Sequence, residues 1–108
     1  MELDIAKMDQ RDVTILVYLS AQGKHISEIS AVSLERLMYE LGAPLKKKMG
    51  EDKQYKKFYN AMRRLEKSLF VSRGFKIGKQ VTYYLTPKGK KIAEVIRNLQ
   101  KDRERSLK

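Results

Sequence analysis

Residues 52–99 constrain the fold most, because they read in order as a basic amphipathic helix, a two-stranded hairpin and a second helix. The first helix is expected over residues 53–68, where apolar side chains recur at intervals of three and four. This spacing places them in one stripe that must be buried against other elements. The stripe consists of Tyr55, Phe58, Met62, Leu65 and Leu69.

The opposite face of the same helix carries cations and one amide, and no acid. Its residues are Lys53, Lys56, Lys57, Asn60, Arg63, Arg64 and Lys67. A run of charge on a helix is often no more than a solvated face, but there the bases usually alternate with acids. The missing acids favour an anionic partner. Asn60 and Arg63 lie near the centre of the face, where an amide can pair with adenine and a guanidinium with guanine.

The hairpin that follows adds further cations beside this helix. Strands are expected over residues 69–73 and 80–85, with Leu69, Val71, Val81, Tyr83 and Leu85 inward by period two. The strands and the turn between them carry Arg73, Lys76 and Lys79, which are predicted to contact a nucleic-acid backbone or minor groove. The alternative is an ordinary hairpin whose edge is protected by lysines.

Capping residues mark the other helices. Asp9 is a good N-cap for a helix that runs to about residue 22, and Ser27 and Ser30 are two alternative caps for the next helix. That second helix is expected to end at Gly42.

Two further capping signals flank the basic helix and the hairpin. Asp52 is the expected N-cap of the basic helix. Thr86 followed by Pro87 is a strong signal for the start of the final helix, whose apolar stripe ends at Leu99.

A chain of 108 residues predicts one small domain. We expect a short arm over residues 1–8, the domain over residues 9–100 and a charged tail over residues 101–108. The net charge of +11 is unevenly placed, because residues 1–42 hold four basic and seven acidic residues, whereas residues 43–108 hold twenty and six. This asymmetry favours a binding surface for an anionic partner over a general role in solubility.

The composition argues against several classes of function. The chain has no cysteine, and its single histidine, His25, has no close carboxylate cluster, so we expect no metal site and no cofactor. No Gly-rich phosphate loop and no nucleophile motif is present, which predicts a protein that is not an enzyme. The N-terminus is acidic and the apolar runs are short, so we expect a cytoplasmic protein without a membrane segment.

The order of elements resembles the winged helix-turn-helix regulators of bacteria and archaea of the MarR- and PadR-like type. Segment 59–73, YNAMRRLEKSLFVSR, is similar to the end of a recognition helix entering the first wing strand. Segment 81–96, VTYYLTPKGKKIAEVI, is similar to the second wing strand, the Leu-Thr-Pro-x-Gly junction and the following helix.

The chain departs from that pattern at two places. Residues 42–52 are longer than the usual turn before the recognition helix, so either that helix begins near Leu45 or the turn is enlarged. Ser68 stands where such regulators often have glycine.

The resemblance implies an α+β, mostly helical winged helix-turn-helix fold with a two- to three-stranded antiparallel wing. It implies a transcriptional regulator that binds double-stranded DNA through the basic helix and the wing, and that forms a homodimer through its terminal helices. Two alternatives remain open, a sequence-tolerant architectural protein of the nucleoid and a winged-helix module that binds another protein. No residue pattern marks a site for a small-molecule effector.

Overall fold

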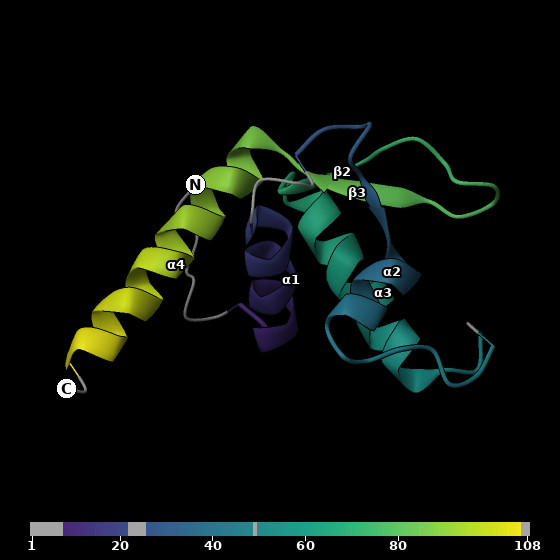
Figure 1. Cartoon of the computed structure of the whole chain (residues 1–108), viewed down its shortest axis with the longest axis horizontal. Helices are drawn as coiled ribbons and strands as arrows, with labels where there is room; N and C mark the ends of the chain where they lie inside the picture. Colours follow the sequence, from purple (N-terminus) through teal and green to yellow (C-terminus); the bar gives the residue numbers. More distant parts are fainter. Residues whose placement is uncertain (1–7, 22–25, 49, 107–108) are drawn as a thin grey trace.

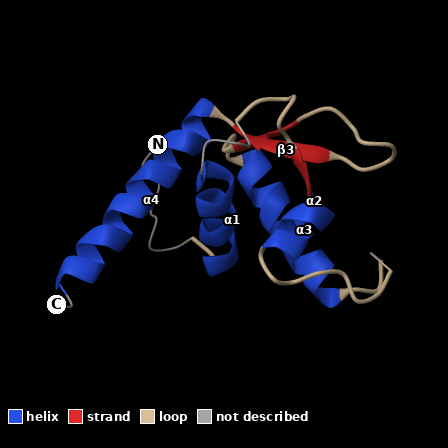
Figure 2. Ribbon diagram, viewed as in Figure 1, coloured by secondary structure: helices blue, strands red, loops and turns tan. Residues whose placement is uncertain are grey.

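The computed structural model describes residues 8–21, 26–48 and 50–106, with side chains described as far as residue 101. Within this part, four helices and three short strands occur in the order α1-β1-α2-α3-β2-β3-α4. The strands lie together at one end of the helices, and α4 extends away on the side of α1 opposite the hairpin (Figures 1 and 2). Residues 1–7 of the arm predicted over residues 1–8, and His25, fall outside the described residues.

The first helix, α1 (Gln10–Ser20), forms the centre of the domain. Its N-cap is Asp9, as predicted, whose carboxylate accepts a hydrogen bond of 2.8 Å from the backbone N–H of Arg11. Ile15, Leu16 and Leu19 are completely buried. This burial arises because α1 packs against both α3 and α4.

The second helix, α2 (Leu34–Glu40), is shorter than predicted because Val32 and Ser33 form strand β1. Its N-cap is Ser33, so the predicted caps at Ser27 and Ser30 are wrong. Those two hydroxyls lie 3.0 Å apart within a turn instead. The predicted end at Gly42 is confirmed, since Gly42 has a φ of +81° and its N–H bonds the carbonyl of Tyr39.

The sheet is antiparallel, and its central strand is β3 (Thr82–Leu85), which pairs with β1 on one side and with β2 (Val71–Arg73) on the other. The strand pair β2–β3 is the predicted hairpin. Leu69 was expected to point inward, and this is wrong because it lies before the strand with a φ of +65° and is 65% exposed. Phe70 is buried in its place.

The last helix, α4 (Pro87–Ser106), begins at the predicted Thr86–Pro87 signal. The Thr86 hydroxyl accepts a hydrogen bond of 3.0 Å from the N–H of Gly89 and donates one of 2.6 Å to the carbonyl of Leu69. The helix continues past Leu99 to Ser106, so most of the segment expected to be a separate charged tail is helical.

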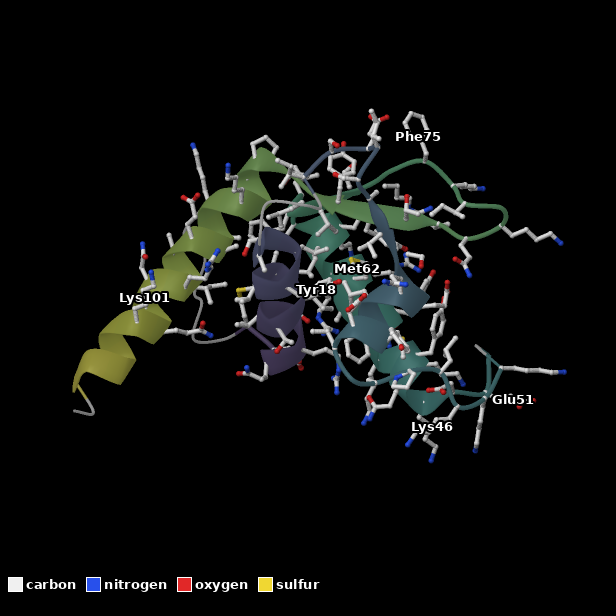
Figure 3. The ribbon with its side chains drawn as sticks, viewed as in Figure 1. Tyr18, Lys46, Glu51, Met62, Phe75 and Lys101 are labelled. Carbon is white, nitrogen blue, oxygen red and sulfur yellow. The ribbon has the colours of Figure 1, made fainter. Side chains whose placement is uncertain are left out.

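A single hydrophobic cluster joins the helices to the inner face of the sheet. It includes Ile15 and Leu19 of α1, Met62 and Leu65 of α3, and Ile96 of α4. Figure 3 shows Met62 in the interior between the helices, while Lys101 lies out along α4. Since α3 contributes Phe58, Ala61, Met62 and Leu65 to this core, its opposite face is fixed toward solvent.

Candidate nucleic-acid interface

Helix α3 (Lys53–Lys67) presents the predicted basic face to solvent. Phe58, Ala61, Met62 and Leu65 are buried, and the helix packs against α1 and α2. The exposed side chains of the opposite face are Lys53, Lys56, Lys57, Asn60, Arg63, Arg64 and Lys67. At about 1.5 Å per residue, the 15 residues of α3 span about 22 Å, a length that can lie in a DNA major groove.

Asp52 determines where α3 begins. One carboxylate oxygen accepts a hydrogen bond of 3.0 Å from the N–H of Tyr55, and the other accepts one of 3.0 Å from the N–H of Lys46. These backbone N–H groups hold the pKa of Asp52 below its usual value, because they stabilise the ionised form. Of the two alternatives for residues 42–52, the enlarged turn is therefore the one observed.

Arg64 is held by a second contact that reaches across the domain. Its guanidinium donates hydrogen bonds of 2.7 and 3.1 Å to the two carboxylate oxygens of Asp12 on α1. This bond and the Asp12 charge raise the pKa of Arg64. Asp12 is only 6% exposed, so a predicted DNA contact is here the partner of a buried acid. The sequence feature that could have indicated this pair is Asp12 itself, an acid at a position of α1 that is buried.

Arg73 of the hairpin is likewise engaged within the chain. It donates a hydrogen bond of 2.8 Å to Glu66, which lies on the flank of α3 beyond the basic face. The Glu66 carboxylate raises the pKa of Arg73. This pair fixes the base of the hairpin against the C-terminal half of α3, and it leaves Arg73 less free to contact a phosphate.

Lys76 and Lys79 are exposed near the tip of the hairpin, as predicted. Ile77 and Gln80 exchange two backbone hydrogen bonds of 3.0 Å around a two-residue turn, in which Gly78 takes a φ of +61°. Phe75 and Ile77 are 63% and 62% exposed, and Figure 3 shows Phe75 on the outer side of the hairpin. The tip therefore offers cations and apolar side chains together.

A row of stacked side chains on α3 was missed by sequence reasoning. Tyr55 and Tyr59 stack with ring centroids 6.2 Å apart and planes at 23°, and the guanidinium of Arg63 lies 6.0 Å from the centre of the Tyr59 ring. Tyr59 is half-buried and packs against the edge of the core. The sequence feature that could have indicated this row is the spacing of Tyr55, Tyr59 and Arg63 at intervals of four residues.

The connector before α3 adds the exposed run Lys46, Lys47 and Lys48 beside the N-terminal end of the helix. Figure 3 shows Lys46 and Glu51 on this connector. Among the described residues, no three His, Asp or Glu side chains are grouped as a metal ion would require. No helix in the described part of the chain is long and apolar enough to cross a bilayer.

Comparison of structures, and not comparison of sequences, finds known proteins that are similar to this chain. No protein-family profile and no curated protein matches the sequence. Among solved structures, MepR, a transcription regulator of the Staphylococcus aureus multidrug efflux pump MepA, matches with a TM-score of 0.70 and 17% identity. That match covers 94% of this chain. The chain has a winged-helix fold. The predicted fold class is thereby confirmed, because the chain has four helices and a three-stranded antiparallel sheet that includes the wing strands β2 and β3.

Two other MepR structures match the winged helix at the same 17% identity. The MepR–DNA complex matches with a TM-score of 0.66 over 93% of this chain and 63% of MepR. MepR bound to ethidium bromide matches with a TM-score of 0.64 over 97% of this chain and 66% of MepR. In the first match described above, the chain spans 64% of the length of MepR.

Proposed function

We propose that this chain is a transcriptional regulator that binds double-stranded DNA, with α3 in the major groove and the wing on the adjacent backbone or minor groove. The observation that carries the proposal is the exposed face of α3, which is basic and free of acids on a helix fixed by Asp52 and Arg64. MepR, which has the same fold, has been solved in complex with DNA, and this supports DNA binding by the chain.

The roles of the side chains follow from their positions. Lysines along α3 and Lys76 and Lys79 of the wing supply phosphate contacts, which give affinity and a steep dependence on salt. Asn60 and Arg63 supply base contacts, which give selectivity. Arg64 and Arg73 act mainly within the chain, since both are bound to acids.

Fluorescence anisotropy on pooled genomic duplexes and on a random duplex, at about 50 and 200 mM salt, tests this proposal. A regulator retains a subset of the genomic fragments at the higher salt. Equal binding to both pools that falls steeply with salt would instead support the sequence-tolerant architectural alternative, which the basic residues 43–108 also favour. Little binding at the lower salt would contradict DNA binding and support a protein-interaction module.

We propose further that the chain acts as a homodimer in the cytoplasm, associated with the nucleoid through DNA. Val95 and Leu99 are 45% and 50% exposed on α4, next to buried Ile96, so the helix has apolar surface beyond what α1 covers. Sedimentation velocity of the chain and of Leu99→Lys distinguishes a dimer that dissociates on substitution from a monomer.

A further inference from the structure

The tyrosine row on α3 forms one wall of a hollow on the proposed DNA-binding surface. The hollow measures about 280 Å³ and is open to solvent. It is lined by Gly50 of the connector and by Tyr55, Lys56, Tyr59 and Asn60 of α3. Since Lys56 and Asn60 belong to the exposed basic face, the hollow opens on the side of the helix that would meet a major groove.

Two contacts hold the ring of Tyr59 in place. The ring of Tyr59 stacks on Tyr55 at 6.2 Å and lies beneath the guanidinium of Arg63 at 6.0 Å. Burial raises the pKa of the Tyr55 hydroxyl, which favours its neutral form. The hollow therefore has a preformed aromatic wall, which needs little ordering when a ligand enters.

The chemistry of this wall selects among the groups that a major groove presents. Aromatic faces carry partial negative charge, so they disfavour a phosphate, and their apolar surface favours burial of an apolar group. The C5-methyl of thymine is the apolar group on base edges in the major groove. The amide of Asn60, on the rim of the same hollow, is of the type that pairs with the N6 and N7 of adenine.

We propose that this hollow is a thymine-methyl site, in which Tyr55 and Tyr59 receive the methyl-bearing edge of a thymine base while Arg63 is held on Tyr59 toward the next base. The inference rests on the proposed function and deepens it, because it assigns a base preference to residues outside the basic face. Tyr59 is accordingly both a contact to thymine and a positioning residue for Arg63.

The test compares thymine with uracil, which pairs identically and lacks only the methyl. The wild-type chain first selects its highest-affinity duplex from a randomised pool. Each thymidine of that duplex is then replaced singly by deoxyuridine. Anisotropy gives the ratio of the Kd of the substituted duplex to the Kd of the original duplex. Loss of one buried methyl predicts roughly fourfold weaker binding at one position in each half-site.

Protein variants show whether the tyrosine wall causes this discrimination. Tyr59→Ala should bring the uracil-to-thymine ratio at that position to about one, whereas Tyr59→Phe, which keeps the ring, should retain it. Tyr55→Ala provides a second readout if Tyr59→Ala fails a circular-dichroism check of folding. Tyr39→Ala is the matched control, because Tyr39 is an exposed tyrosine on α2 that lies under Arg36 at 5.9 Å.

Three outcomes would overturn the proposal. The first is wild-type binding that is unchanged by every uracil substitution. The second is full thymine preference in a folded Tyr59→Ala, and the third is loss of the preference in Tyr39→Ala. If no duplex is selected at all, the proposed function fails as well, so the two failures are distinguishable.

Discussion

Arg64 of α3 and Asp12 of α1 form an ion pair with a shortest N–O distance of 2.7 Å across 52 positions of sequence. The two hydrogen bonds join both carboxylate oxygens to the guanidinium, a geometry that fixes direction as well as distance. The pair therefore adds to the packing of the buried apolar residues in holding the rotation of α3 about its axis.

Arg64→Ala should destabilise the domain by about 1–3 kcal/mol, because it leaves the carboxylate of Asp12 buried without its partner. Urea unfolding monitored by circular dichroism gives this free energy. The matched control is Arg36→Ala, which removes the exposed Arg36–Glu40 pair on α2 and should cost no more than about 0.5 kcal/mol. A double variant with Asp12→Ala should cost less than the sum of its parts; strict additivity would contradict the coupling.

Leu69→Gly should stabilise the domain by about 0.5–1 kcal/mol. Leu69 holds the left-handed conformation at the end of α3, where the N–H of Phe70 bonds the carbonyl of Leu65 at 3.0 Å. This conformation is strained for an L-residue and easy for glycine, and the exposed leucine side chain contributes little burial. Thermal and urea unfolding measure the gain. Leu69→Ala retains the Cβ and should not stabilise, so an equal gain from alanine would refute the backbone explanation.

Gly89→Ala should destabilise the domain by about 1–3 kcal/mol, although alanine is the better helix former. A Cβ at this position would collide with the backbone carbonyl oxygen of Phe70, which cannot move without disturbing the wing. The same urea experiment measures the loss. Gly50→Ala is the control, because a Cβ there meets nothing within 4 Å, and its effect should stay within about 0.5 kcal/mol.

The sequence predicted best those features that depend on neighbouring residues. The start of α3 at Asp52 and of α4 at Thr86 and Pro87 are capping events, and a cap lies within three residues of the groups it bonds. The cap of α2 could not be chosen this way, since three serines offer the same chemistry. Ser33 is selected because its pairing with Thr82 in β3 places it in the sheet.

The basic face was predicted from periodicity, but the acids that bind individual cations within the chain were not. Nothing near Arg64 in the sequence indicates its bond to Asp12, and the bond of Arg73 to Glu66 forms only when the hairpin folds back beside α3. The choice between an enlarged turn and an earlier start of α3 could not be made from the sequence for a similar reason. The turn is closed by the bond from the N–H of Lys46 to Asp52, six residues away.

Arg63→Ala should weaken binding to the preferred duplex by about 1–3 kcal/mol and relax selectivity at the base it contacts, because a guanidinium–guanine pair carries sequence information. Lys57→Ala is the matched contrast on the same helix. Loss of a phosphate contact there should weaken binding about equally on all duplexes and reduce the salt slope by about one. Anisotropy across salt concentrations measures both. Equal behaviour of the two variants would count against a base-reading role for Arg63.

The cap at Asp52 predicts a loss of stability in acid that is specific to this residue. Its folded-state pKa is lowered by the N–H groups of Lys46 and Tyr55, so ionised Asp52 favours the folded state. Its contribution is fully present above the unfolded pKa of about 3.9 and is lost as the pH falls through the lower folded value.

Urea unfolding between about pH 2.5 and 6 tests this prediction of acid sensitivity. Asp52→Asn keeps an oxygen for the cap but cannot ionise, so its free energy of unfolding should fall less steeply below about pH 4 than that of the wild type. Glu51→Gln, which removes an exposed neighbouring acid and keeps Asp52, is the matched control. Parallel profiles for Asp52→Asn and the wild type would show that the cap is not held by the charge.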